Sequence, residues 1–399
     1  MKIGILSNNR KLYSTIRLKD AARRRGHSVK IIESNKITIF VERGHPSMHY
    51  DGKPLERLNA IVPRSSAAQS FVATAVVRQF EQMGTYCLNA SHAIAIANDK
   101  LRTLQILSRH NIGLPASAFV VNRNDIPNAI DKVGGAPLII KLISGTQGAG
   151  VMLAESKNTA EAILEALQAT HQQVLVQKFI SESRGRDIRA FVVGNRVVAA
   201  MRRIASGDEF RSNFHLGASM EKVELSSDYE TAAIHAAHIL GLRVAGVDLL
   251  ESDSGPQVME VNSSPGLEGI EATTNVDIAD AVIEYLEEQV DFPDVDMRER
   301  LSLGRGYGIV EIPVARKSQL SKNSIRDNEL WKQEIQILSI IRNGLTIPSP
   351  SMEEVIMVGD RLICFGKELA LKGLLPARTT KKSRKLLKNL PEREVTDVQ

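Results

Sequence analysis

The stretch KLISGTQGAGVML, residues 141–153, decides how the central part of this chain is expected to fold. Its G-x-x-x-x-G spacing fits the first half of a P-loop, but a P-loop continues as Gly-Lys-Ser/Thr into a helix. Here Val151 and Met152 follow Gly150, and the next residues alternate as in a strand. We therefore predict a glycine-rich hairpin tip whose uncovered N–H groups close on a polyphosphate, with Lys141 on the strand before it. An ordinary surface hairpin is the alternative.

A second stretch, GVDLLESDSGPQVMEVNSSPG at 246–266, predicts two strands joined by the turn SDSG. If the hairpin is symmetric about this turn, Asp248 lies opposite Glu260 and Gly246 lies opposite Asn262. Two carboxylates directly opposite one another destabilise a sheet, and burying them unpaired costs still more. Two carboxylates and an amide oxygen are, however, ligands that Mg²⁺ prefers. We expect a metal site here, with an exposed acidic hairpin as the alternative.

Basic and polar residues lie between these two stretches, on predicted strands and loops. Arginine at such positions can neutralise a transferring phosphoryl group, although any one of them alone is more simply explained as a surface residue. These residues are Arg189, Arg202, Arg203, Arg211, Asn213 and His215.

The order of predicted elements indicates a mixed α/β and α+β chain. At the N-terminus, KIGILS, a helical stretch closed by Gly26 and HSVKIIE form a strand–helix–strand unit, which implies a parallel sheet. Farther on, Gly194 and Asn195 predict a tight hairpin between two long strands. Ser227 and Glu230 are expected to form a capping box at the start of a later helix.

The composition, 43% hydrophobic and 24% charged over 399 residues, is that of an ordinary globular protein. The 4% of aromatic residues argues against nucleic-acid binding by stacking. Residues 371–399 hold eight Lys or Arg and three Asp or Glu, which accounts for the whole net charge of +5. We expect a solvated basic tail, or one that touches RNA.

Cys87 and Cys364 lie far apart and form neither a disulfide framework nor a zinc pattern. No apolar run approaches about 18 residues, and the N-terminus lacks the apolar core of a signal peptide. We therefore expect no membrane contact and a cytoplasmic location.

Taken together, these motifs resemble the RimK-type ATP-grasp ligases. The resemblance covers about residues 1–290 and rests on KLISGTQGAGVMLAES, VQKFI, GRDIRAFVVG, FRSNFHLGA, AGVDLL and VMEVNSSPGLEGIE, which occur in the family's order. It implies a Rossmann-like pre-ATP-grasp domain, followed by an ATP-grasp fold whose two subdomains hold ATP between them.

Carried over motif by motif, the resemblance implies a set of site residues. Arg203 and Arg211 would be catalytic, neutralising the charge on the transferring phosphoryl group. Asp248, Glu260 and Asn262 would bind Mg²⁺ or Mn²⁺, as two ions. The nucleotide-binding residues would be Lys100, Lys141, Gly148, Gln177, Lys178, Phe179, Asp187, Arg211, Ser212 and Asn213.

The resemblance also implies the reaction. The family's best-known member adds L-glutamate to the C-terminus of the sixth small-subunit ribosomal protein, and its relatives attach other amino acids to different acceptors. We therefore expect an ADP-forming carboxylate–amine ligase. It would join L-glutamate, through an acylphosphate, to the C-terminal carboxylate of a protein or peptide, with a ribosomal protein as the first candidate.

One residue departs from the family's pattern, because Lys178 stands where an acidic residue is usual. If backbone groups read the adenine, the change is tolerated, whereas a required carboxylate would alter nucleotide affinity or base choice. Two alternatives therefore stay open. One is a nucleotide-responsive regulatory protein with lapsed catalysis, and the other is a ligase that adds another amino acid to a small-molecule acceptor.

A further module follows the ligase-like part. IVEIPVARKSQL, ILSIIRNG and the ending GD-x-L-I-x-x-G resemble the TrkA-C (RCK-C) domain of potassium-channel regulators. This resemblance implies a dimerising or ligand-sensing module, so we expect a homo-oligomer. The expected domains are a pre-ATP-grasp domain (1–95), an ATP-grasp domain (96–290, with subdomains about 96–175 and 176–290), a linker (291–307), a TrkA-C-like domain (308–378) and a basic tail (379–399).

Overall fold

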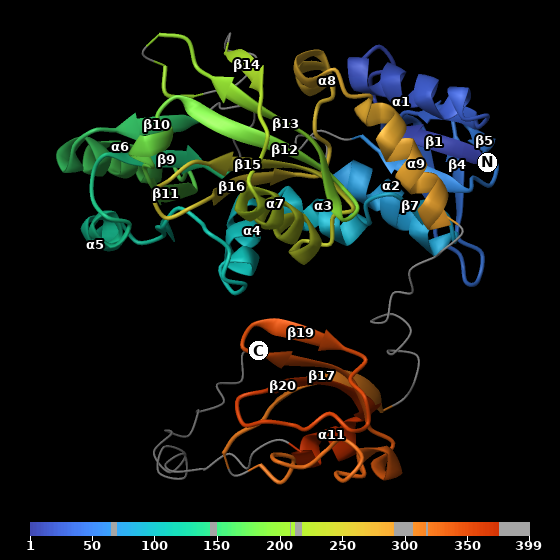
Figure 1. Cartoon of the computed structure of the whole chain (residues 1–399). Helices are drawn as coiled ribbons and strands as arrows, with labels where there is room; N and C mark the ends of the chain where they lie inside the picture. Colours follow the sequence, from blue (N-terminus) through green and yellow to red (C-terminus); the bar gives the residue numbers. More distant parts are fainter. Residues whose placement is uncertain are drawn as a thin grey trace, which may run out of the picture. The chain divides into compact units, whose positions relative to one another are not determined.

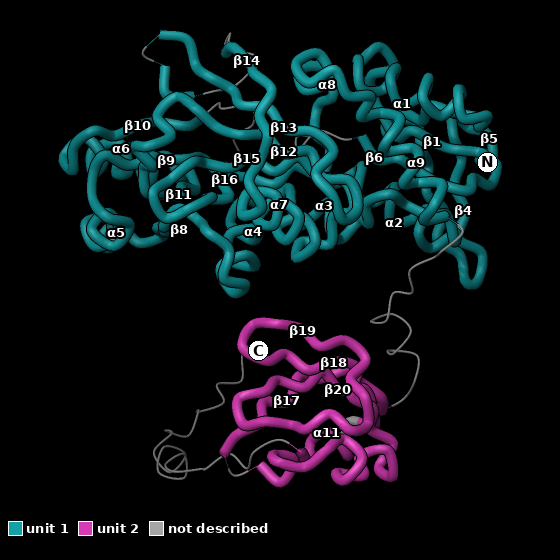
Figure 2. Tube along the Cα trace, in the orientation of Figure 1, with its two compact units in different colours: residues 1–293 teal, residues 294–399 magenta. Residues whose placement is uncertain are grey.

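The chain folds into two compact units, residues 1–293 and 294–399 (Figure 2). The computed structural model describes residues 1–64, 70–143, 150–207, 209–211, 218–290, 306–316 and 318–374. Within these described ranges, no helix is long and apolar enough to span a bilayer.

A parallel sheet forms the N-terminal part of the first unit (Figure 1). Its strand order is β2-β1-β6-β7, and β1 runs parallel to both of its neighbours, which confirms the predicted strand–helix–strand opening. The elements of this part are β1 (Lys2–Leu6), α1 (Tyr13–Arg24), β2 (Ser28–Ile32), η1 (Ser34–Lys36), β3 (Ile37–Phe40), β4 (Ser47–Tyr50), β5 (Lys53–Pro54), β6 (Ala60–Pro63), α2 (Ser70–Gln82), β7 (Tyr86–Cys87) and α3 (Ser91–Ala97).

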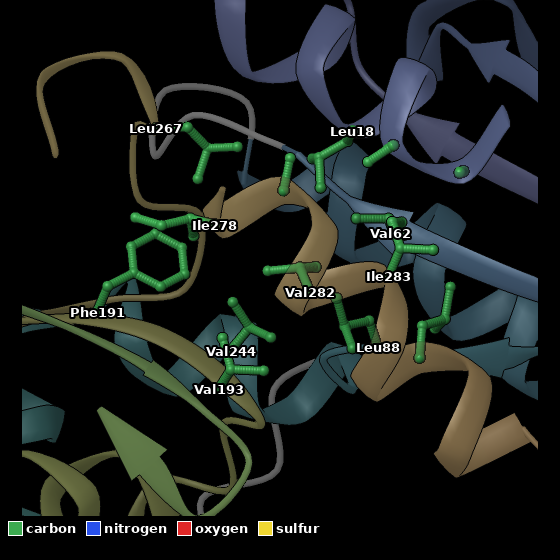
Figure 3. Close-up of a cluster of buried hydrophobic side chains, with 14 of the residues drawn as sticks. Leu18, Val62, Leu88, Phe191, Val193, Val244, Leu267, Ile278, Val282 and Ile283 are labelled. Atoms are coloured by element: carbon green, nitrogen blue, oxygen red, sulfur yellow. The ribbon is translucent and has the colours of Figure 1, made fainter. Parts of the chain in front are cut away.

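Helices from both ends of the first unit cover this sheet. Leu18 of α1 and Ile283 of α9 (Ile278–Val290) pack with Val62 of β6 in one apolar cluster (Figure 3). The opposite face packs against Phe80 of α2. The N-terminal sheet is therefore the middle of three layers, and one outer layer is completed by a helix about two hundred residues later in the chain.

The glycine-rich stretch lies on a second, antiparallel sheet of order β10-β9-β11-β8. Val151 pairs with Lys141 across the antiparallel strands β9 and β10, so the predicted hairpin is confirmed and the P-loop is excluded. Residues 144–149, including the predicted nucleotide ligand Gly148, lie outside the described residues. The elements here are α4 (Lys100–Leu107), β8 (Ser117–Phe119), η3 (Arg123–Asp125), α5 (Ile126–Lys132), β9 (Leu138–Leu142), β10 (Val151–Ala154), α6 (Lys157–Ala169) and β11 (Val174–Lys178).

A third sheet, antiparallel throughout and of order β14-β13-β12-β15-β16, carries the acidic hairpin. One face packs against α7 through Ala233 and Val247. The elements are η4 (Ser181–Ser183), β12 (Arg186–Val193), β13 (Arg196–Ile204), β14 (Ser219–Lys222), α7 (Ser227–Ile239), β15 (Val244–Leu250), β16 (Gln257–Asn262) and α8 (Glu268–Thr274). The Gly194-Asn195 turn joins β12 to β13 as predicted.

The expected capping box at Ser227 and Glu230 is not formed. Ser226 is the N-cap of α7, and its side chain makes no capping hydrogen bond. Its carbonyl instead accepts from the N–H of Glu230, at 3.1 Å. Two adjacent serines offer the same side-chain chemistry, so the sequence did not distinguish which of them precedes the helix.

The second unit is built on an antiparallel sheet of order β17-β20-β18-β19. Its core contains Ile312, Ile340, Leu362 and Cys364. Between β17 and β18, the described residues include a short 3₁₀ turn. The elements are β17 (Tyr307–Pro313), η6 (Leu330–Gln333), β18 (Gln336–Arg342), β19 (Leu345–Pro348), β20 (Arg361–Lys367) and α11 (Glu368–Leu374).

The GD-x-L-I-x-x-G motif of this unit has a clear structural role. Gly359 has φ of +96°, a conformation that favours glycine. Asp360, only 2% exposed, accepts bidentate hydrogen bonds from Arg342, both 2.9 Å, and a further one from the Met357 N–H at 2.8 Å. Burial raises the pKa of Asp360, but its bonds to Arg342 outweigh that effect and lower the pKa overall.

We predict that Asp360→Asn destabilises the second unit by about 3 kcal/mol, because breaking a buried pair leaves the other charge uncompensated. Trp331 is the single tryptophan of the chain and lies in this unit, so its fluorescence during urea unfolding measures the loss. The lowered pKa places this stabilisation above about pH 4 and removes it as the pH falls further. Glu353→Gln, which breaks an exposed pair with Arg326, serves as the control and should cost less than about 1 kcal/mol.

Candidate active site

The acidic hairpin has the register that the sequence predicts around its carboxylates. Asp248 pairs with Glu260, and Gly246 pairs with Asn262. Beyond Asp248 the symmetric pairing ends, because Leu249 pairs with Val258 and Met259 is an extra residue in β16. This β-bulge bends the strand next to the carboxylates, at a place where bulges commonly aim functional side chains.

Asp248 lies at the centre of a buried ion network. Arg189 donates to both of its carboxylate oxygens at 2.7 Å, and Arg203 Nη2 lies 3.0 Å from Oδ2. Arg203 in turn donates to both oxygens of Asp187, at 2.6 and 2.7 Å. The Asp248, Arg203 and Asp187 side chains are at most 4% exposed.

The electrostatics of this network favour the charged forms. Burial alone raises the pKa of Asp248, but Arg189 and Arg203 outweigh it and hold the pKa below its ordinary value. Burial likewise lowers the pKa of Arg203, and the two aspartates more than reverse that effect. Asp248 is therefore a carboxylate at neutral pH, as a metal ligand must be.

Arg203, predicted to be catalytic, is thus buried between Asp187 and Asp248, where it fixes the Asp248 carboxylate. Arg189 does the same from the neighbouring strand but received no individual role from the family resemblance. The sequence held a signal for it, because Asp187 and Arg189 are two residues apart on a strand and share a face.

Glu260 and Asn262 complete the oxygen-rich edge. Glu260 is exposed, whereas Asn262 is partly buried, and its Nδ2 has no hydrogen-bond partner among the described residues. A buried polar atom without a partner is the kind of position that a ligand satisfies. The two ends of an asparagine amide are assigned from their hydrogen bonds, so Asn262 can present its oxygen to a cation.

These three residues fit a magnesium ion that also takes ligands from its substrate. No group of three or more His, Cys, Asp and Glu in the described ranges could hold a metal. Two carboxylates and an amide are too few for a closed cage, but Mg²⁺ commonly binds one or two carboxylates together with substrate phosphates and water.

Gly246 allows a close approach at this edge. A Cβ at this position would lie 2.7 Å from the Cβ of Pro265, in the turn that follows Asn262, and 3.8 Å from Nε of Arg189. Any larger residue would push that turn away from the hairpin. Glycine here therefore keeps the end of β16 packed against β15.

Two lysines bring positive charge to the same place. Burial lowers the pKa of Lys141 to about 8, with smaller effects from Glu260, Lys100 and Asp248. These interactions place Lys141 near the carboxylates of the third sheet, although it belongs to the second. Lys100 Nζ donates to the carbonyl of Ile143, at 3.3 Å, just before the glycine-rich loop.

The predicted hinge strand, β11, is in place. Gln177 is buried and donates to Ser117 Oγ at 2.9 Å, so its side chain holds β8 to β11. Lys178 is exposed, and its backbone N–H is already bonded to the carbonyl of Ala116, at 2.8 Å. Phe179 is partly buried, with the Arg184 guanidinium 6.0 Å from its ring centre.

Arg211 lies beside an acidic neighbour that the sequence did not single out. Its guanidinium donates to Glu209 at 3.0 and 2.8 Å, and these bonds lower the pKa of Glu209 to about 2. Ser212 and Asn213, the other residues predicted to contact the triphosphate here, lie outside the described residues.

Comparisons with known proteins show the family of this chain. Residues 1–94 match the family model of the RimK PreATP-grasp domain, and residues 97–286 match that of the RimK-like ATP-grasp domain. The chain belongs to the RimK-like ATP-grasp family. It is an ATP-grasp ligase with a pre-ATP-grasp domain, so the predicted fold class and enzyme class are both confirmed.

Two relatives in this RimK-like family are equally similar in sequence but align over different lengths of the chain. A probable alpha-L-glutamate ligase of Rhodopirellula baltica is 51% identical over 396 residues, 99% of this chain and 98% of its own length. One of Pseudomonas aeruginosa is 51% identical over 287 residues, 72% of this chain and 95% of its own. The second unit is thus shared with the first relative and largely absent from the second.

A solved structure has the same ATP-grasp fold. The ATP-grasp ligase PsnB, complexed with a minimal precursor, Mg and ADP, has a TM-score of 0.58 and 22% sequence identity. The match covers 73% of this chain and 98% of PsnB. At this identity the likeness establishes the fold alone.

We predict that Lys141→Met weakens binding of a non-hydrolysable ATP analogue with Mg²⁺ by roughly 10- to 100-fold, because a charged hydrogen-bond donor is lost. With a pKa near 8, the wild-type affinity should also fall about tenfold between pH 7 and pH 9, since the triphosphate binds the protonated lysine. Isothermal titration calorimetry measures both effects. Lys141→Arg stays charged and should lose the pH dependence; an equal dependence in that variant would contradict the assignment.

Proposed function

We propose that this chain is an L-glutamate ligase that acts on the C-terminal carboxylate of a protein or peptide, with a small-subunit ribosomal protein as the first candidate acceptor. The observation that carries the proposal is the pairing of Asp248 with Glu260 beside Asn262, close enough to Lys141 for both carboxylates to affect its pKa. Relatives 51% identical to this chain are named probable alpha-L-glutamate ligases, which supports glutamate as the incoming amino acid. We place the boundary between the pre-ATP-grasp and ATP-grasp domains at residues 95 and 96.

The reaction has two steps. An oxygen of the acceptor carboxylate attacks the γ-phosphorus of ATP, ADP leaves, and an acylphosphate forms. The amino group of glutamate then attacks the acyl carbon, inorganic phosphate leaves, and the nitrogen loses a proton to give an amide. No protein nucleophile takes part.

Each side chain of the site has a part in this scheme. Lys141 and Lys100 bind the triphosphate, and Arg211 neutralises charge on the transferring phosphoryl group. Arg189 and Arg203 hold Asp248 in one orientation, so the hairpin is preorganised before substrate binds. Asp248, Glu260 and Asn262 would hold a magnesium ion, which would supply positive charge for phosphoryl transfer.

In this scheme the glycine-rich loop between β9 and β10 is the lid over the nucleotide. A closed lid excludes water, which would otherwise hydrolyse the acylphosphate. Adenine is read by backbone groups of the hinge after Lys178, which explains how a lysine is tolerated where the family usually has an acidic residue.

We predict that Glu260→Gln lowers glutamate-dependent ADP release by a factor on the order of 100 or more, because the amide is a weaker ligand for a hard cation. Glu260 is exposed, so the melting temperature should not change. Glu224→Gln, at another exposed glutamate, is the matched control and should keep wild-type turnover. Tight ATP binding without any turnover in the wild-type protein would instead indicate a regulator with lapsed catalysis.

The same assay tests the acylphosphate. An acceptor whose reacting carboxylate carries ¹⁸O should transfer one labelled oxygen to the released inorganic phosphate, which mass spectrometry detects. Phosphate without the label would exclude an acylphosphate on the acceptor.

We further propose that the second unit is a TrkA-C-like module that dimerises the ligase or senses a small ligand. Its motif residues Gly359 and Asp360 lie in a turn whose single buried carboxylate, that of Asp360, is bound by Arg342, which supports an ordered module rather than an irregular tail. The Pseudomonas aeruginosa relative aligns over 95% of its length without this unit, so the ligase part is expected to work alone.

Deleting residues 294–399 should therefore leave ADP release within about threefold of the full chain while converting an oligomer to a monomer or removing an effector response. Light scattering and turnover assays with and without candidate effectors measure the change. An unchanged mass and an unchanged response at all effector concentrations would contradict a regulatory role.

A further inference from the structure

Arg64 stands at a special position in the N-terminal sheet. The chain passes from β1 outward to β2 on one side and later to β6 on the other, so the strand order reverses between β1 and β6. In open α/β sheets, ligands bind outside the carboxyl ends of the strands at such a reversal. Arg64 directly follows β6 at that end, and its N–H donates to the carbonyl of Leu6, the last residue of β1, at 2.8 Å.

Among the described residues, the Arg64 side chain has none of the carboxylate partners that other buried arginines have. It is partly buried, and none of the described residues forms a hydrogen bond or an ion pair with its guanidinium. Burial lowers its pKa to about 10. By contrast, Arg189, Arg203 and Arg342 each bind a carboxylate through two nitrogens.

An uncompensated buried cation costs stability, and proteins seldom keep one without a partner. A guanidinium presents a planar fork of N–H donors that matches a carboxylate. Since none of the described residues supplies such a partner, we look for it in a substrate.

Arg64 is close to the end of the acidic hairpin. It lines a small cavity together with Asn89 and Ser263, and Ser263 directly follows Asn262. The neighbouring Ser264 hydroxyl donates to the carbonyl of Pro63, at 3.4 Å. Apolar residues around this cavity, among them Val62, Phe191, Val244 and Leu267, are shown in Figure 3.

Two cationic side chains thus approach the acidic hairpin from two different sheets. Lys141 approaches the carboxylates from the second sheet, where the nucleotide-binding loop lies, whereas Arg64 approaches the end of β16 from the N-terminal sheet. We propose that Arg64 binds a carboxylate of a substrate of the ligase, at the switch point of the N-terminal sheet. This inference rests on the proposed function, in which both the incoming glutamate and the acceptor bring carboxylates.

The sequence did not single out Arg64, because an arginine after a strand is most simply a solvated residue. That no described residue pairs with it becomes visible only when the packing of β1, β6 and the 263–267 turn is known. Arg64 takes part in none of the covalent steps of the reaction. Its proposed role is to bind a substrate carboxylate.

The test uses Arg64→Met, which keeps an unbranched apolar stem and removes the charge, with Arg57→Met as the control at an exposed arginine of the same domain. Calorimetry on the full chain, loaded with a non-hydrolysable ATP analogue and Mg²⁺, measures the affinity for two probes. One probe is L-glutamate and the other is a glutamate tetrapeptide, which ends in the carboxylate that a glutamate-adding enzyme would use as acceptor.

We expect Arg64→Met to weaken one probe roughly 10- to 100-fold, the loss for a charge-assisted pair, and to leave the ATP analogue unaffected. Weakening of L-glutamate alone identifies the incoming amino acid as the source of the carboxylate. Weakening of the tetrapeptide alone identifies the acceptor. The melting temperature without ligands should not fall, because the variant removes an uncompensated charge.

Three results would overturn the inference. Unchanged affinity for both probes in Arg64→Met, with binding intact in the wild type, would overturn it and leave the proposed function standing. A lower melting temperature with unchanged affinities would show that Arg64 is structural. If the wild-type protein binds neither probe, the proposed function fails together with the inference.

Discussion

The fixed position of the Asp248 carboxylate is the constraint on which the rest of the site depends. A charge with almost no access to water survives only when it is paired and hydrogen-bonded, and here two guanidinium groups do both. Because those groups come from β12 and β13, three neighbouring strands must keep their register for the site to exist. The position of the Asp248 carboxylate and the stability of the sheet therefore depend on the same strand register.

The charges of the site are arranged in layers. The buried layer is an ion network with no net charge, formed by Asp187, Arg203, Asp248 and Arg189. Glu260 and Lys141 lie outside this network, where nucleotide and metal would bind. A network whose charges cancel costs less to bury than isolated charges, and it leaves Glu260 and Lys141 outside these ion pairs. The N-terminal sheet is the third part of this arrangement. The carboxyl ends of its strands meet the turn that follows the acidic hairpin.

Much of this could be predicted from the sequence, and the failures have physical causes. The register of Asp248 with Glu260 followed from strand alternation about a central turn, and the glycine hairpin followed from the missing helix after Gly150. The bulge at Met259 was not predicted, because an apolar residue suits either face of a buried strand. The pairing of Arg203 with two aspartates was also hidden, since single-residue patterns do not reveal which side chains meet across strands.

The packing of α9 on the N-terminal sheet has a consequence for how the chain is made. The apolar face formed by Leu18 and Val62 is covered only when Ile283 and its neighbours arrive. A growing chain that has emerged only as far as β7 therefore displays an unfinished hydrophobic surface while some two hundred further residues are translated. During that interval a chaperone, or the ribosome surface itself, has to shield what α9 will later cover.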